Sequence, residues 1–164
     1  MKPLRIAGVI RESIVDGPGW RFVVFAQGCP HRCPGCHNPK THDFEDGTDV
    51  TPEKIMEEAK KNPLLAGLTF SGGEPFCQPE PFARLADLAR DAGLHIMAWS
   101  GYTYDQIAAD SKMRELLIRC DLLIDGPFLI EQKDLLLKFR GSKNQRIIDV
   151  KASLAAGKAV ETGL

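Results

Sequence analysis

Short apolar runs alternate with amphipathic segments along the whole chain. Runs rich in Val, Ile, Leu and Phe predict buried strands, and they fall at residues 6–10, 22–26, 67–71, 95–99, 121–124 and 145–150. Helical patterns cover residues 51–61, 79–92, parts of 104–119 and, more weakly, 151–156. Because strands and helices alternate, the sequence predicts a mostly parallel sheet with helices packed outside it.

Residues that start or stop helices support three of these boundaries. Thr51 precedes Pro52, and this pair is typical of an N-cap followed by the first helical residue. The run Asn62-Pro63 ends the same helix. Gly93 follows the helix predicted over 79–92 and fits a C-terminal cap. Both helices therefore lie between predicted strands, as the alternation requires.

Six predicted strands are too few to close an eight-stranded barrel. The sequence therefore predicts an α/β fold of the open, partial (β/α) barrel type. The chain has no internal repeat or obvious linker, so we expect one domain over residues 1–164. Ligands bind at the carboxyl ends of parallel strands. The loops with suggestive residues at such ends are 28–39, 72–75, 100–101 and 125–126.

Composition narrows the class of protein. The 164 residues are 43% hydrophobic and 26% charged, which is ordinary for a globular domain. The formal net charge is -1, from 21 basic and 22 acidic side chains, so no nucleic-acid or membrane-surface partner is indicated. No signal peptide or membrane span is evident, and we expect a cytoplasmic protein. Its five cysteines then stay reduced and act as metal ligands or core residues.

Three cysteines carry most of the chemical information. Cys29, Cys33 and Cys36 follow the spacing C-x3-C-x2-C. Such thiolates can hold three irons of a four-iron cluster and leave one iron open to a substrate or cofactor, whereas a ferredoxin-type electron carrier uses four cysteines. A structural zinc site is the alternative, and its fourth ligand could be His31, His37 or His42.

The two other cysteines are interpreted as small buried side chains. Cys77 lies just after the glycine-rich loop, so a role as a fourth ligand stays open for it. Cys120 does not lie next to that loop in the sequence. In that loop Gly72 and Gly73 would let the backbone approach a ligand, and Glu74 with nearby carbonyls would suit an ammonium group. A plain strand-to-helix turn is the alternative for this loop.

Further loops are less specific. Asp125 could orient a cofactor or hold a cation, but a β-turn is an equally good interpretation of the residues around it. The aromatic run 99–103 would line a pocket or cap the core, and the basic run 140–146 would meet an acidic group or be a solvated loop.

Taken together, these motifs resemble the radical S-adenosylmethionine family. The resemblance lies in the cysteine spacing and in Gly72-Gly73-Glu74 followed by Pro75. Residues 15–22 are similar to the opening of glycyl-radical-activating enzymes. The runs 28–38, 99–103, 125–128 and 140–146 resemble the small activators of anaerobic ribonucleoside-triphosphate reductases. Gly35 departs from the pattern, because many members place an aromatic residue before the third cysteine.

The resemblance implies a mechanism and a set of cofactors. Cys29, Cys33 and Cys36 would bind a [4Fe-4S] cluster whose open iron chelates S-adenosyl-L-methionine. The residues that would bind the nucleotide are Gly35, Cys36, His37, Gly72, Gly73, Glu74, Pro75 and Asp125. Reductive cleavage would give a radical that abstracts hydrogen from a glycine of the large reductase subunit.

The resemblance also implies partner proteins, and two alternative functions stay open. A flavodoxin or ferredoxin would supply the electron, and Asp16 and Arg21 would guide the glycine loop. A small radical enzyme that forms a deazapurine from a small molecule is the nearest alternative. A zinc-binding interaction module without chemistry is the alternative from a different class.

Overall fold

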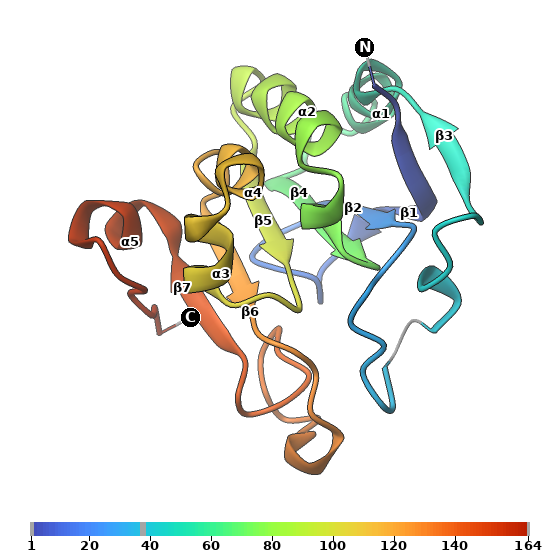
Figure 1. The fold of residues 1–164 in the computed structure, drawn as a ribbon. Helices are drawn as coiled ribbons and strands as arrows, with labels where there is room; N and C mark the ends of the chain where they lie inside the picture. The colour runs from blue at the N-terminus through green and yellow to red at the C-terminus, as the bar shows by residue number, and fades with distance from the viewer. Residues whose placement is uncertain (1, 37–38, 164) are drawn as a thin grey trace.

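The computed structural model describes residues 2–36 and 39–163. Seven strands in these ranges form one sheet in the order β3-β1-β2-β4-β5-β6-β7 (Figure 1). The strands are β1 (Leu4–Ser13), β2 (Arg21–Ala26), β3 (Thr48–Val50), β4 (Gly67–Gly72), β5 (His95–Trp99), β6 (Leu122–Asp125) and β7 (Arg146–Asp149). The six predicted strands are all present, and β3 is the strand that the sequence pattern did not reveal.

The centre of the sheet is parallel. β2, β4, β5 and β6 pair in parallel, while β1 pairs antiparallel with β2 and β7 antiparallel with β6. β3 pairs antiparallel with β1 and so runs in the direction of the central strands. The prediction of a mostly parallel sheet is therefore confirmed. β3 and β7 lie at opposite ends of the strand order and do not pair, so the sheet stays open as predicted.

The helices are α1 (Pro52–Ala59), α2 (Pro79–Asp91), α3 (Tyr104–Ala109), α4 (Ser111–Leu117) and α5 (Val150–Ala156). Thr51 caps α1 by accepting a hydrogen bond from the Lys54 amide, as its position in the sequence predicts. The segment predicted over 104–119 is two helices, because Asp110 adopts an extended conformation and its side chain caps α4. Within the described ranges, none of the helices is both long and apolar enough to span a membrane.

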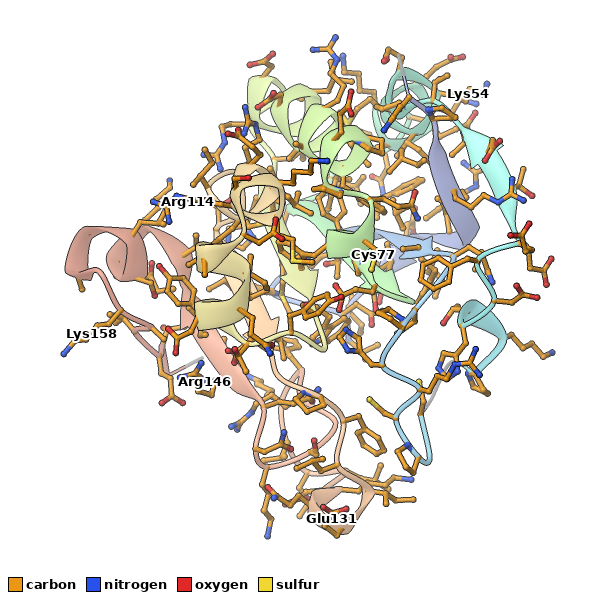
Figure 2. All side chains as sticks on the ribbon, viewed as in Figure 1. Lys54, Cys77, Arg114, Glu131, Arg146 and Lys158 are labelled. Atoms are coloured by element: carbon orange, nitrogen blue, oxygen red, sulfur yellow. The ribbon has the colours of Figure 1, made fainter. Side chains whose placement is uncertain are left out.

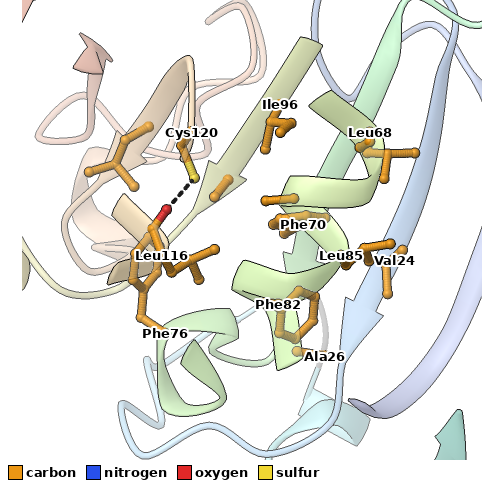
Figure 3. Close-up of a cluster of buried hydrophobic side chains, with 14 of the residues drawn as sticks. Val24, Ala26, Leu68, Phe70, Phe76, Phe82, Leu85, Ile96, Leu116 and Cys120 are labelled. Atoms are coloured by element: carbon orange, nitrogen blue, oxygen red, sulfur yellow. Dashed lines mark hydrogen bonds between the residues drawn. The ribbon is translucent and has the colours of Figure 1, made fainter. Parts of the chain in front are cut away.

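The main core lies between the sheet and the helices α1 to α4, which cover one of its faces (Figure 1). Phe70 of β4 and Phe82 of α2 are fully buried, with ring centroids 4.9 Å apart (Figure 3). Cys120 belongs to this core, where its thiol donates to the Leu116 carbonyl and burial raises its pKa to about 12. This placement agrees with its interpretation as a buried core residue.

The opposite face of the sheet carries a second and smaller apolar cluster, which consists of Met97, Leu122, Ile124 and Ile147 with Trp99 and Phe139 packed against it. Helices α1 to α4 contribute no residue to it. The segments that follow β2 and β6 extend past the carboxyl ends of the central strands, toward the bottom of Figure 1. The fold therefore leaves that face and that end of the sheet to loops.

Candidate active site

A cavity of about 390 Å³ lies at the carboxyl ends of the central strands. The segment after β2 contributes Cys29, Cys33 and Cys36, and the end of β4 contributes Gly72 and Gly73. Further lining residues follow β5 and β6, and they include Ser100, Gly101, Gly126 and Phe128. The four loops that the sequence placed at strand ends thus meet around one space, as the rule for parallel sheets requires.

The three thiols line the same cavity and could together hold a metal group. None of the five cysteines is in a disulfide. No group of three or more His, Cys, Asp or Glu among the described residues is arranged to hold one metal ion. A tetrahedral zinc site with Zn–S bonds of 2.3 Å needs sulfurs about 3.8 Å apart, whereas a four-iron cluster holds each thiolate on a different iron. Three thiolates in one cavity supply the donor set that a cluster with one open iron requires.

Cys29 is the most enclosed of the three cysteines of this loop. It is 9% exposed, and its amide donates to the His42 carbonyl at 3.2 Å. Desolvation by burial raises the pKa of its thiol to about 11, against the lowering effect of nearby backbone donors. In the metal-free protein this thiol is therefore protonated at neutral pH, and binding of a metal cluster must release its proton.

The glycine pair holds the cysteine loop against the sheet. The Gly73 amide donates to the Ala26 carbonyl at 2.8 Å, and the next amide donates to the Gly28 carbonyl at 2.8 Å. A Cβ at Gly73 would lie 2.4 Å from the Gly28 oxygen and 2.8 Å from the Thr41 oxygen. Gly72 has φ +92, which a residue with a side chain rarely adopts. Glycine is needed at both positions so that the two backbones can touch.

The Glu74 carboxylate points into the protein. It is completely buried and accepts hydrogen bonds from His31 Nε2 at 2.6 Å, Ser100 Oγ at 2.8 Å, the Gly101 amide at 2.8 Å and the Phe76 amide at 3.1 Å. It does not line the cavity, unlike the two glycines before it. The structure therefore gives this carboxylate four protein partners at the place where the sequence analysis expected a ligand ammonium group.

Three other predicted residues also lie off the cavity wall. Pro75 is buried at the start of a single 3-10 turn, and Gly35, with φ +72, approaches Ile130. Asp125 is 1% exposed and accepts from Arg146 Nη2 at 2.6 Å and Nε at 3.0 Å, an ion pair that raises the Arg146 pKa. Figure 2 marks Arg146 on β7. His37 falls outside the described residues.

The two residues expected to guide a substrate loop have different surroundings. Asp16 lines the cavity. Arg21 is fully buried, and its guanidinium donates to the Pro18 and Leu68 carbonyls at 2.8 Å each. Desolvation lowers its pKa to about 10. Arg21 therefore anchors the loop before β2 and does not face the cavity.

Cys77 does not line the cavity either. It lies on the turn after β4 (Figure 2), where its thiol is 3.9 Å from the Tyr102 hydroxyl and burial raises its pKa. This position favours three cysteine ligands over four.

His42 is a cavity residue that the sequence suggested only as a zinc ligand. Its Nε2 atom is buried and has no hydrogen-bond partner among the described residues. A buried polar atom without a partner is costly unless a bound group completes its hydrogen bonding. His42 therefore brings a buried polar atom without a partner to the surroundings of the cavity, in addition to three thiols and two glycines. A cluster and a bound nucleotide both fit these residue types.

Comparison with known proteins identifies related iron–sulfur proteins. The profile of the "4Fe-4S single cluster domain" matches residues 15–148. The anaerobic ribonucleoside-triphosphate reductase-activating protein of Haemophilus influenzae is 36% identical over 144 residues, which are 82% of this chain and 91% of that protein. The protein of the same name from Escherichia coli K12 is 36% identical over 145 residues, 81% and 90% of the two chains.

Two further matches are more distant. The pyruvate formate-lyase-activating enzyme of Clostridium pasteurianum is 36% identical over 126 residues, which are 73% of this chain and 50% of that protein. Among solved structures, QueE from Escherichia coli aligns with a TM-score of 0.48 at 16% identity, over 62% of this chain and 53% of that chain.

The cysteine loop, the open α/β sheet and the matching iron–sulfur domain define an enzyme of the radical S-adenosylmethionine class, an oxidoreductase. Within that class, the identities over more than four fifths of the chain place it in one family. The chain belongs to the anaerobic ribonucleoside-triphosphate reductase-activating proteins.

Proposed function

We propose that this protein cleaves S-adenosyl-L-methionine reductively at a [4Fe-4S] cluster and generates a glycyl radical on the large subunit of anaerobic ribonucleoside-triphosphate reductase. The observation that carries the proposal is the meeting of three thiols and the Gly72-Gly73 backbone in one cavity at the strand ends. The name that relatives at 34–36% identity carry supports the choice of reductase as the substrate protein.

In this proposal Cys29, Cys33 and Cys36 hold the cluster. The chemistry that the bound cofactors supply is the one-electron cleavage of a carbon–sulfur bond, which belongs to the cofactors and not to the side chains. The chain contributes binding, orientation and exclusion of water. Gly72 and Gly73 line the cavity, and His42 Nε2 would gain a partner if the bound group reached it.

Aromatic and apolar side chains form the rest of the wall. Trp99, Phe128 and Phe139 line the cavity, and the Trp99 indole is fixed by donating to the Phe139 carbonyl at 2.8 Å. Such a wall lowers the polarity around a reactive centre and keeps water away from it. Asp16 lines the cavity, and its sequence neighbours Ile14 and Val15 are 64% and 71% exposed. We assign this segment to contact with the substrate protein.

We further propose that a flavodoxin or ferredoxin supplies the electron, that the enzyme works in the cytoplasm, and that residues 1–164 form a single domain. Reduced cysteine ligands are maintained in that compartment, which is consistent with the absence of any disulfide. The choice of reductant and compartment rests on the chemistry of the cluster, and the single domain on the one sheet that β1 to β7 form.

The test is anaerobic. The reconstituted protein is mixed with S-adenosyl-L-methionine, a reductant and the large reductase subunit, and a glycyl radical is sought by electron paramagnetic resonance. We expect the radical signal with the parent protein and with Cys77→Ala, and none with Cys36→Ala. Methionine release without a radical on the reductase would favour the small-molecule alternative. A colourless zinc protein without iron or sulfide would contradict the proposal altogether.

A further inference from the structure

His31 reaches from the middle of the cysteine loop into the sheet. It lies between Cys29 and Cys33 in sequence, and its side chain is 15% exposed. The ring contacts Tyr102 edge-on, with centroids 4.4 Å apart at 74°. It fills the space next to Gly101 so closely that a Cβ there would lie 2.4 Å from its Cδ2 atom. The histidine is therefore seated in a slot at the end of β5.

Glu74 forms the floor of this slot. Its carboxylate accepts hydrogen bonds from His31 Nε2, Ser100 Oγ and the amides of Gly101 and Phe76. Ser100 and Gly101 follow β5, and Phe76 follows β4. A carboxylate has about four lone-pair positions for hydrogen bonds. The four donors around Glu74 fill that number, so no position remains for an ammonium group of a ligand.

The loop beside His31 needs such an anchor. Arg32 has φ +48, a left-handed conformation that is uncommon for a residue with a side chain. Conformations of this kind persist only where the surrounding structure holds them. Arg32 lies between the seated histidine and the ligand Cys33, so a fixed His31 also fixes the backbone that leads to this thiol.

We propose that His31 is a positioning residue for the cluster ligands, and that Glu74 acts on the cofactor site through His31 and not by contact with the cofactor. The inference rests on the proposed function only in taking the cysteine loop as the cluster loop. It differs from the expectation that Glu74 binds the methionine ammonium. The geometry behind it involves only residues of this chain.

The first test measures amide hydrogen exchange over residues 29–36 in the metal-free protein. His31→Phe keeps an aromatic ring against Tyr102 but cannot donate, and a lost bond to a charged acceptor should speed exchange about tenfold or more. His31→Gln keeps an N–H donor of similar reach and should restore exchange to within about threefold of the parent. Tyr102→Phe keeps the ring contact and serves as the matched control, with no change expected.

The second test uses the reconstituted protein. We expect His31→Phe to lose iron to a chelator faster than the parent and to show a broadened spectrum of the reduced cluster, and His31→Gln to resemble the parent. Gly101→Ala is a second variant, because its Cβ displaces the His31 ring while leaving His31 and Glu74 in the chain. It should reproduce the His31→Phe exchange pattern.

Several results would overturn the inference. Unchanged loop exchange in His31→Phe would show that the histidine anchors nothing, and equal damage in His31→Gln would show that the donor is irrelevant. Weaker S-adenosyl-L-methionine binding in Glu74→Gln with normal loop exchange would restore a direct role for Glu74. Because the exchange experiment needs no cofactor, reductant or reductase, failure of the proposed function would leave its outcome intact, and the two can be judged separately.

Discussion

Replacing Gly73 by alanine tests the close contact between the sheet and the cysteine loop. The added Cβ would lie 2.4 Å from the Gly28 oxygen, where ordinary contacts begin at 3.4 Å, so a separation of about 1 Å is required. The atoms in the way are backbone, including the Thr41 oxygen, and they cannot rotate aside as a side chain would. The loop must therefore move from the end of β4.

The expected loss of stability follows from this displacement of the cysteine loop. Overpacking in a tight site costs about 1–3 kcal/mol, and the shift also weakens the backbone bonds that join the loop to the sheet. For a protein of this size, each kcal/mol lowers Tm by about 2–4 °C. We expect Gly73→Ala to lower the Tm of the metal-free protein by about 2–12 °C and to reduce its iron content after reconstitution.

Gly8→Ala is the control. Gly8 lies on β1, a Cβ there meets nothing within 4 Å, and its φ is not in the left-handed region. Alanine should leave Tm unchanged or raise it slightly, because it restricts the unfolded chain. The assay is thermal unfolding of both variants under anaerobic conditions. A Gly73→Ala protein with the parent's Tm and full iron content would refute the argument that two backbones must touch here.

The remaining predictions concern the cysteines. Alanine at Cys29, Cys33 or Cys36 should abolish the absorbance of the cluster. Cys77→Ala and Cys120→Ala should keep this absorbance, because neither residue lines the cavity. Loss of the cluster in Cys77→Ala would contradict a site with three cysteine ligands. In the metal-free protein Cys29 should react slowly with iodoacetamide at pH 8, because at a pKa of about 11 only about one thiol in a thousand is ionised. Its rate should rise about tenfold per pH unit up to pH ~11, and a rate that is flat above pH 8 would show that the thiol is already ionised.

Most strands and helices could be predicted because the sequence pattern of each lies within a few consecutive residues. The strands that pair in the parallel centre are short runs of β-branched and aromatic residues, such as Phe22–Ala26, which a single window of sequence reveals. β3 was missed because Thr48–Val50 is three residues long and lies at the edge of the sheet, with two of them exposed. An edge strand of that kind has no buried face to give it a pattern.

The sequence predicted which thiols and glycines share the cavity, but it did not predict which partners the buried carboxylates bind. The spacing of Cys29, Cys33 and Cys36 is visible within eight residues, and their common cavity follows from the strand-end rule. The partners of a carboxylate depend instead on residues distant in sequence. Glu74 meets His31, 43 positions away, and Asp125 meets Arg146, 21 positions away. No local pattern records which donors a buried acid will find.

The uneven covering of the sheet has a consequence for access. Helices α1 to α4 seal one face through the main core, whereas the cavity is walled largely by the segments that follow β2 and β6. Those segments can part without breaking any pairing between the central strands. Opening the wall on the β2 side would nevertheless break the hydrogen bonds that join the cysteine loop to the end of β4, so access there is coupled to the stability of the loop.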